Sequence, residues 1–251
     1  MKLTSNTIII TGGATGIGLA LAERFLQAGS EVIICGRRKT KLQKAKRKHP
    51  QIHIRSCDVS KKSERVSFFK WVTKEFPHLN VLINNAAIKC HIQLIQNEKR
   101  DKTRQEIAIN FEAAVHFSRL FIPHLLKQRN PVIINITSGL AFSPLAIAPI
   151  YCAMKSALHS FTISLRYQLS KTPIKIVEII PPPINTDLGG AGLHSFGIPI
   201  DEFADNAVKR LESGEHEISY GASEKVTRAS RKELDEICRR MNQSFLNEIE
   251  P

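Results

Sequence analysis

A glycine-rich segment at residues 11–18 constrains the fold of this chain more than any other part of the sequence. It follows an uncharged, β-branched run at residues 6–11 that predicts a buried strand. After it, Ile17, Leu21 and Phe25 recur at helical spacing, which predicts an amphipathic helix. A strand, a turn spaced G-x-x-x-G-x-G and a helix aim free backbone N–H groups at a phosphate. The segment predicts a dinucleotide site, the alternative being an ordinary loop between strand and helix.

The residues after the second expected strand indicate which dinucleotide would bind. Residues 31–35 predict that strand, and Gly36 stands where NAD-selective folds usually carry an acid for the ribose 2′-hydroxyl. Arg37 and Arg38 follow, so that no carboxylate repels a 2′-phosphate and a guanidinium is available to bind it. These residues favour NADP(H) over NAD(H). The alternative is that they only begin a basic, solvated helix through residues 39–48.

A tyrosine, a lysine and a serine carry the expected chemistry. Tyr151 and Lys155 are four residues apart and therefore neighbours on one helix face. Ser138 follows a strand expected at residues 132–136, at the edge of the sheet where ligands of α/β folds bind. The Lys155 ammonium, together with a nicotinamide cation, is expected to lower the pKa of Tyr151 for acid/base work near neutral pH. The alternative is that the four-residue spacing of Tyr151 and Lys155 arises by chance.

These features together resemble the short-chain dehydrogenase/reductase family over nearly the whole chain. The resemblance implies a catalytic tetrad of Asn110, Ser138, Tyr151 and Lys155. In that tetrad Ser138 polarises the substrate oxygen, Lys155 reaches the cofactor ribose, and Asn110 holds a water that relays protons to solvent. The alternative for Asn110 is that it caps or bends its helix.

The same resemblance implies a set of cofactor contacts. Asp58 would contact the adenine amino group, Val59 the ring, and Thr186 the nicotinamide carboxamide. The run at residues 84–87 is similar to the family's Asn-Asn-Ala-Gly. The implied cofactor-binding residues are Gly12, Thr15, Gly16, Ile17, Gly18, Arg37, Arg38, Asp58, Val59, Asn85, Ala86, Tyr151, Lys155, Pro181, Ile184 and Thr186.

Three residues depart from the family pattern. Ala87 and Ala113 replace usual glycines, and Pro182 replaces the glycine of a Pro-Gly pair. Because proline has no N–H, the backbone near the nicotinamide must take another course. Residues 181–203, with the segments 218–224 and 230–236, resemble more narrowly the DltE-type oxidoreductases of bacteria, which also carry the double proline. That resemblance implies no particular substrate.

The alternation of expected strands and helices predicts one α/β domain over residues 1–251. We expect a Rossmann-like, doubly wound parallel sheet of about seven strands, with helices on both faces. The later elements are expected as helices near 61–76, 101–128, 152–170 and 201–213, and strands near 174–180 and 216–220.

Two segments late in the chain carry separate expectations. Residues 182–200 form a long Gly- and Pro-rich stretch, a candidate substrate lid, with an inert excursion as the alternative. Residues 230–243 predict an amphipathic helix that begins with a Ser230–Glu233 capping box. That helix is expected to dock on the body or on a partner subunit.

The formal charge of +13 indicates attraction to anions. The basic residues 37–48 have no interleaved aromatics, so no nucleic-acid partner is expected. No membrane partner is expected either, because the apolar run at Ile8 is short and enters the glycine turn. Five cysteines, an odd number without ligand spacing, fit reduced thiols in the cytoplasm, and no metal is expected.

We expect an NADP(H)-dependent oxidoreductase that interconverts a carbonyl compound and a secondary alcohol. A 3-oxoacyl thioester reductase is the alternative enzyme, and a dinucleotide-binding sensor or scaffold without turnover is the alternative from another class. The apolar helices near 101–128 and 152–170 predict a homodimer or homotetramer. The expected apolar pocket residues are Leu140, Phe142, Leu145, Ile147 and Leu188, with His91 and His194 at its border.

Overall fold

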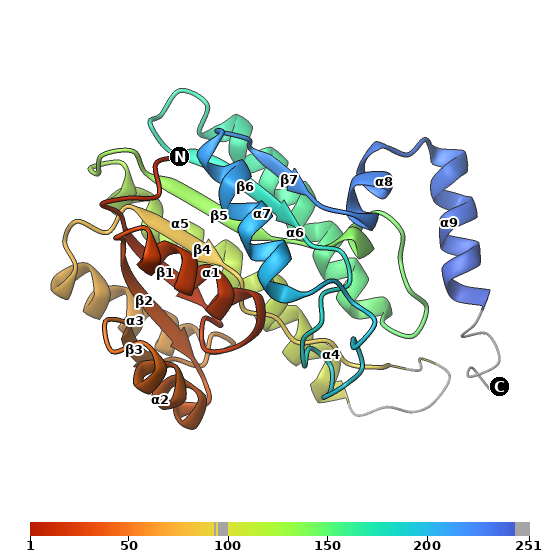
Figure 1. Cartoon of the computed structure of the whole chain (residues 1–251), viewed down its shortest axis with the longest axis horizontal. Coiled ribbons are helices and arrows are strands. Elements are labelled where there is room, and N and C mark those ends of the chain that lie inside the picture. Colours follow the sequence, from red (N-terminus) through yellow and green to blue (C-terminus); the bar gives the residue numbers. More distant parts are fainter. Residues whose placement is uncertain (93, 95–99, 244–251) are drawn as a thin grey trace.

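Seven parallel strands form the centre of the molecule, in the order β3-β2-β1-β4-β5-β6-β7 (Figure 1). The computed structural model describes residues 1–92, 94 and 100–243. The strands are β1 Thr7–Thr11, β2 Glu31–Gly36, β3 His53–Ser56, β4 Val81–Asn84, β5 Val132–Ile136, β6 Lys175–Ile180 and β7 Glu217–Ser219. The predicted fold class is confirmed. The third strand ends at Ser56, so that Asp58 and Val59 lie in the following loop.

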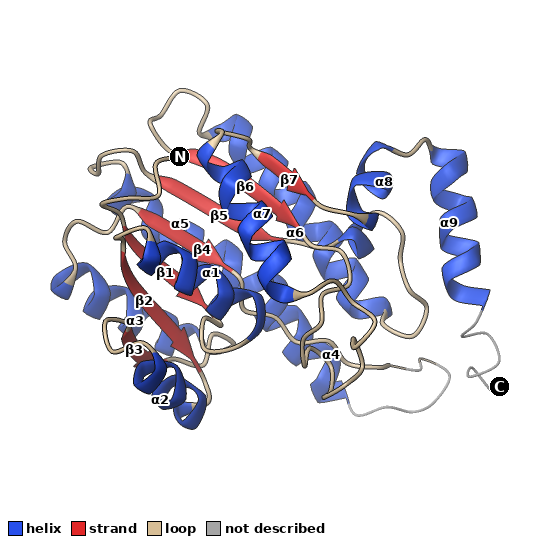
Figure 2. Cartoon of the chain, viewed as in Figure 1, coloured by secondary structure: helices blue, strands red, loops and turns tan. Residues whose placement is uncertain are grey.

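Helices cover both faces of the sheet (Figure 2). Ile8 and Ile10 of β1 pack with helices on one face and Ile9 with those on the other, as the two-residue period of a strand requires. All three are fully buried, which explains why this strand carries no polar residue at these positions. One layer contains α1 Gly16–Gln27, α2 Lys39–Lys48 and α7 Ile200–Glu212, and the other contains α3 Lys62–Glu75, α5 Ala113–Leu125 and α6 Pro149–Gln168.

The strand order changes direction at β1, which pairs with β2 on one side and β4 on the other. The chain therefore leaves these neighbouring strands toward opposite faces. In open α/β sheets such a switch point opens a crevice at the carboxyl ends of the strands. The glycine-rich segment follows β1 directly and so lies at this crevice.

The long helix predicted over residues 101–128 is wrong as a single regular helix. The structure has α4 Arg100–Ile107, then the π-helical segment η1 Ala108–Glu112, and then α5. Asn110 lies in the π-helical segment, where the wider turn moves its side chain out of regular helical register. Pro123 lies within the last part of α5, which ends at Leu125, three residues before the predicted end.

Between β7 and residue 243, where the described part of the chain ends, there are two further helices. The short helix α8 Ala222–Arg228 was not predicted, whereas α9 Arg231–Gln243 agrees with the amphipathic helix expected there. The predicted capping box is present: Ser230 N and Oγ each donate to Glu233 Oε2 at 2.7 Å. Figure 1 shows α9 beside the body, outside both helical layers.

Helix α9 docks through residues near its carboxyl end. Asn242 Nδ2 donates to Pro144 O at 2.9 Å, and Ala146 N donates to Asn242 Oδ1 at 2.6 Å. The amphipathic face thus meets the segment between β5 and α6. Within the described part of the chain, no helix combines the length and apolar character needed to cross a membrane.

Candidate active site

A cavity of about 1050 Å³ lies at the carboxyl edge of the sheet. It is lined by the turn after β1, the ends of β2, β4, β5 and β6, and the first turns of α6. The predicted site residues that line it are Gly12, Thr15, Gly16, Ile17, Arg37, Arg38, Asp58, Val59, Asn85, Ala86, Ser138, Tyr151, Lys155, Pro181, Ile184 and Thr186. Gly18 and Asn110 do not line it.

The glycine turn has the backbone geometry of an anion site. Gly12 and Gly16 have φ angles of +65° and +57°, a region that side-chain-bearing residues rarely adopt. Thr15, the residue before α1, gives no side-chain cap, so the first N–H groups of this helix are left to other partners. Gly18 serves packing, since a Cβ there would lie 2.8 Å from Gly12 O. The predicted cofactor contact of Gly18 therefore finds no support in the cavity lining.

The end of β2 presents two exposed cations. A Cβ on Gly36 would meet no atom within 4 Å, so the backbone here is open to the cavity. Arg37 and Arg38 are both exposed, and Arg38 Nη2 donates to Thr15 Oγ1 at 3.4 Å. This bond directs the Arg38 guanidinium toward the glycine turn.

Two asparagines hold the loop after β4 in place. Asn85 Nδ2 donates to Thr11 O at 2.8 Å, which joins this loop to the glycine turn. Asn110 Oδ1 accepts from Ile88 N at 2.9 Å, and its Nδ2 donates to Ile88 O at 2.8 Å. Both polar ends of Asn110 are thus engaged by the backbone, so its clearest role is to fix this loop. The water-relay role stays a prediction.

Tyr151 and Lys155 lie on one face of α6, as predicted, with Nζ of Lys155 5.6 Å from the centre of the phenol ring. The expectation that Lys155 and a nicotinamide cation together lower the Tyr151 pKa stays a prediction, because it concerns the complex with the oxidised cofactor. Burial raises the pKa of Tyr151 above its ordinary value, although a hydrogen bond with Ser138 opposes that effect. The Lys155 ammonium instead donates to Ile136 O at 2.7 Å, and burial lowers its pKa to about 8.

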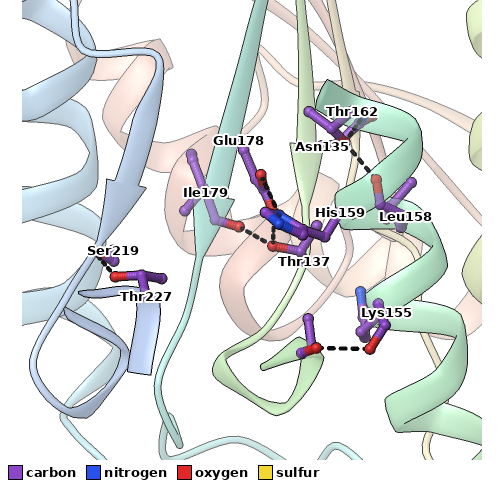
Figure 3. A network of polar contacts seen from close by, with 12 residues as sticks. Asn135, Thr137, Lys155, Leu158, His159, Thr162, Glu178, Ile179, Ser219 and Thr227 are labelled. Atoms are coloured by element: carbon purple, nitrogen blue, oxygen red, sulfur yellow. Dashed lines mark hydrogen bonds and ion pairs between the residues drawn. The ribbon is translucent and has the colours of Figure 1, made fainter. Parts of the chain in front are cut away.

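A buried carboxylate behind these residues was missed by the sequence reasoning. Glu178 of β6 is fully buried, and Figure 3 shows its side chain beside those of His159 and Thr137. Thr137 Oγ1 donates to Glu178 Oε1 at 2.6 Å, and His159 Nδ1 lies 2.9 Å from the same oxygen. The hydrogen bond to Glu178 raises the pKa of His159, and the Glu178 charge acts to raise the pKa of Lys155 against burial.

Two sequence signals pointed to this network. A lone glutamate interrupts an otherwise apolar strand, Lys-Ile-Val-Glu-Ile-Ile. His159 continues the four-residue spacing of Tyr151 and Lys155, so that all three share one helix face. The network lies directly behind Ser138 and Lys155, because Thr137 precedes Ser138 and His159 lies one turn after Lys155.

Arg65 is a second residue that the sequence reasoning missed. It supports the end of the cavity lined by Asp58 and Val59, which we call the nucleotide end. Its side chain is fully buried and donates to Val59 O at 2.6 Å, to Glu112 Oε1 at 2.5 Å and to His116 Nδ1 at 3.0 Å. The guanidinium thus joins α3 and the π-helical segment to the loop that carries Val59. A basic residue in a helix gives no sequence signal for such a role.

The end of the cavity around Tyr151, which we call the substrate end, has only some of the expected lining residues. Leu140, Leu145 and Leu188 pack against a small cluster around Tyr151 and line the cavity, as predicted. Phe142 and Ile147 do not line it: Phe142 packs on the ring of His159 at 4.6 Å, and Ile147 O accepts from Ile92 N at 3.2 Å. His194 lines the cavity, whereas His91 is exposed outside it. Met241 of α9 also lines it.

The segment 182–200 is a loop whose two ends meet. Ile184 and Ile198 form a parallel bridge, Ile198 N donates to Pro183 O at 3.0 Å, and Asn185 N donates to Ile198 O at 3.0 Å. Pro182 precedes this junction, and Pro181 O accepts from Gly139 N at 3.0 Å. The loop thus leaves the sheet and returns at one point, with its middle lying along the substrate end of the cavity.

Comparisons with known proteins place the chain in a family. The pattern that describes short chain dehydrogenases matches residues 6–193. The chain is 44% identical to the uncharacterized oxidoreductase DltE of Bacillus subtilis over 96% of its own length and 98% of that protein. It is 30% identical to an uncharacterized oxidoreductase of Staphylococcus aureus over 73% of this chain and 80% of the other.

Solved structures share the fold. A short chain dehydrogenase from Burkholderia cenocepacia, solved in complex with NADP, aligns with a TM-score of 0.83 at 23% identity, over 95% of this chain and 99% of that one. One from Burkholderia phymatum, solved in complex with NAD, aligns with a TM-score of 0.81 at 17% identity, over 87% of this chain and 90% of that one. With its parallel sheet, its glycine turn and its Ser-Tyr-Lys arrangement, this DltE-like chain belongs to the short chain dehydrogenase family of oxidoreductases.

Proposed function

We propose that this enzyme interconverts a carbonyl compound and a secondary alcohol, with NADP(H) as cofactor and Tyr151 as the acid and base. The observation that carries this proposal is a single cavity lined both by the glycine turn and by Ser138, Tyr151 and Lys155. One end of the cavity has donors for a dinucleotide, and the other has a buried phenol within an apolar wall. A small carbonyl or alcohol fits that wall.

The residues present fit a nicotinamide dinucleotide. The uncapped amino end of α1 provides N–H donors for a pyrophosphate, and no acid in its first turn opposes them. Asp58 and Val59 line the position expected for adenine, and Thr186 lies across from Gly16. When bound, the nicotinamide accepts or supplies the hydride, while the protein supplies position and charge. The relatives solved with NADP and with NAD support this cofactor class.

The preference for NADP(H) rests on the end of β2. Gly36 contributes no carboxylate there, whereas Arg37, Arg38 and Lys41 all line the cavity. A 2′-phosphate would meet this positive edge and form charge-assisted hydrogen bonds with a guanidinium. An unphosphorylated ribose would leave the same cations in contact with solvent only.

The chain's own groups supply the proton chemistry. Because burial raises the pKa of Tyr151, its phenol holds a proton at neutral pH and can donate it to a carbonyl oxygen. The Ser138 hydroxyl, hydrogen-bonded with that phenol, orients the same oxygen. Lys155 is charged below its pKa of about 8, and its positive charge favours the phenolate when the reaction runs toward oxidation.

The test is Tyr151→Phe, which removes the hydroxyl and keeps the ring packing. We expect turnover of NADPH with a panel of ketones, aldehydes and oxoacyl thioesters to fall at least about 100-fold. Cofactor affinity, measured by calorimetry, should stay within error of the wild type. Wild-type turnover by the variant would contradict the mechanism. NADPH binding without turnover of any carbonyl by the wild type would instead favour a sensor.

The proposal includes assembly as a dimer or tetramer through the helices that cover one face. Phe111 of η1 and Phe161 of α6 are half-buried and contact each other edge to face at 6.3 Å. Ile107 beside them is 38% exposed, which leaves apolar surface for a second copy. Light scattering at micromolar concentration tests this, and a strictly monomeric mass would contradict it.

A further inference from the structure

One cation at the substrate end of the cavity has no part in the proposed chemistry. Lys89 lies five residues after the end of β4 and lines the same cavity as Tyr151. Its side chain is half-buried, and burial lowers its pKa. Holding an ammonium in such a place costs free energy unless something compensates it. The surroundings of Lys89 indicate which kind of group compensates its charge.

The loop 182–200 is shaped to lie against Lys89. Gly189 has a φ angle of +86°, and a Cβ on it would lie 3.2 Å from Lys89 Cε and 3.3 Å from Lys89 O. Only a glycine lets the loop approach this closely without displacing the lysine. From the same loop, His194 Nε2 lies 2.7 Å from Lys89 Nζ. The loop thus meets the cation at two points.

The histidine is a neutral partner for this ammonium. Lys89 Nζ can only donate, so Nε2 of His194 accepts and the imidazole carries no charge. Burial and the charge of Lys89 both lower the pKa of His194, consistent with that role. The pair therefore keeps one net positive charge, and the ammonium has further N–H donors beyond the one that His194 takes.

Among the residues that the structure describes, the acidic groups near Lys89 do not neutralise this charge by direct contact. Glu106 is attracted to Lys89, but it does not line the cavity; its Oε1 accepts from Cys90 N at 2.7 Å, and burial raises its pKa. Asp187 lines the cavity but is exposed. The remaining walls near Tyr151 are the apolar side chains of Leu140, Leu145 and Leu188. Among the described residues, the substrate end thus combines an apolar wall with Lys89, a cation separate from the Lys155 ammonium beside Tyr151.

We propose that Lys89, with His194, forms an anion subsite that binds the carboxylate of the substrate, so that this enzyme acts on oxo acids or hydroxy acids with an apolar chain. One ammonium beside a neutral imidazole matches the single charge of a carboxylate, whereas a phosphate group carries more charge and more acceptors. The proposal rests on the proposed function, because it assigns the substrate class of the same site.

A binding experiment tests the subsite without knowledge of the true substrate. Hexanoate and hexanamide share shape and chain length but differ in charge, and each is titrated into the protein saturated with NADPH. Hexanoate should bind about 10- to 150-fold more tightly than hexanamide, the range for a hydrogen bond to a charged group. In Lys89→Met the two should bind equally. Equal binding to the wild type, or no binding of hexanoate, would overturn the proposal.

A second variant and a control separate charge from structure. Gly189→Ala keeps the lysine but adds a Cβ at a positive φ angle 3.2 Å from Lys89 Cε, so it should reduce the preference for hexanoate by disturbing the loop against Lys89. Lys44→Met removes an exposed cation of α2 that does not line the cavity, so the ratio of the two affinities should stay as in the wild type. A Lys44→Met ratio that fell as far as that of Lys89→Met would mean general charge attraction and would overturn the subsite.

Kinetics distinguishes failure of the subsite from failure of the proposed function. For an oxo acid and its methyl ester, Lys89→Met should raise KM for the acid alone and leave kcat for the ester unchanged. If the ester and acid behave alike in both proteins while Tyr151→Phe still abolishes turnover, the subsite is refuted and the reaction stands. Tighter binding of hexyl phosphate than of hexanoate would overturn the carboxylate assignment.

Discussion

The two ends of the active-site cavity are built in different ways. At the nucleotide end, adjacent strands and loops are joined by backbone contacts: Gly12 N donates to Cys35 O at 2.8 Å, and Cys57 N donates to Gly36 O at 3.1 Å. At the substrate end, a loop closed at its base and helix α9, none of whose residues is buried, form the wall. The comparison indicates that the sheet edge fixes cofactor and chemistry, while less buried segments select the substrate.

The largest effect is expected at the nucleotide end, for Arg37→Ala. Loss of a charge-assisted hydrogen bond, roughly 1.5–3 kcal/mol, should weaken NADP(H) binding about 10- to 150-fold and leave NAD(H) binding as it was. Calorimetric titration of both cofactors measures this. Arg119→Ala, at another exposed arginine, is the control. Equal loss for both cofactors would mean that Arg37 supports the fold and not the 2′-phosphate.

Glu178→Gln tests whether the buried network of Glu178, His159 and Thr137 stabilises the sheet edge. The variant keeps the shape but weakens the contact with His159, which we expect to cost about 1–3 kcal/mol of unfolding free energy. Glu178 raises the pKa of His159, with Glu217 assisting and Arg166 opposing. The stabilisation that comes with this raised pKa is fully present below the pKa of histidine in the unfolded chain. It is lost as the pH rises through the higher pKa of His159 in the folded protein.

The difference between Glu178→Gln and wild type should therefore be larger at pH 6 than at pH 9. Urea unfolding at both values measures it, and kcat of the variant should fall while KM changes little. In a His159→Gln background, which lacks the titrating group, the cost of Glu178→Gln should not change with pH. A difference that is constant with pH would show that His159 is not the charged partner.

Gly197→Ala tests whether the base of the loop sets the substrate end. A Cβ there would lie 2.6 Å from Ile184 C and 2.7 Å from Asn185 N, so the two ends of the loop must separate. For a strain of about 1–3 kcal/mol, KM for a carbonyl substrate should rise roughly 10-fold, with cofactor affinity retained. Ser195→Ala, at an exposed position of the same loop, serves as the control. Equal changes in KM for the two variants would show that the base of the loop does not set the substrate end.

The smallest effect is expected for Asn242→Ala, which removes the bonds to Pro144 and Ala146. Each such bond contributes about 0.5–1.5 kcal/mol, so α9 should open more often while the rest of the fold is unchanged. Hydrogen exchange should increase in α9 and not in β5. Uniformly faster exchange would mean that α9 is part of the main cooperative unit.

The sequence predicted the glycine turn and the Ser-Tyr-Lys arrangement at the sheet edge well, and it predicted the substrate end of the cavity poorly, for physical reasons. The glycine turn, Ser138, Tyr151 and Lys155 stand at fixed spacings on regular elements, so their meeting at one edge follows from topology. Lys89 and His194 meet across 105 residues through a loop, and no periodicity relates them. The wider turn at Asn110 depends on its bonds to the Ile88 backbone, which helical spacing does not contain.

Electrostatic states escaped prediction for a similar reason. The spacing of Tyr151 and Lys155 gave their proximity, but the pKa of a phenol depends on how much protein surrounds it. Burial raises the pKa of Tyr151 in the protein alone, an effect that residue spacing does not contain. The expected positions of Phe142 and Ile147 failed because a three-residue 3₁₀ turn at Gly139–Ala141 rotates the segment that follows Ser138.

The bridge between Ile184 and Ile198 has a consequence for how such enzymes diversify. Because the segment between these residues starts and finishes at one junction, it can be exchanged as a cassette, lengthened or shortened without moving the strands that carry the chemistry. New specificities would then arise by insertion and recombination at this junction. An engineer could transplant the cassette from one relative to another and retain the hydride-transfer machinery intact.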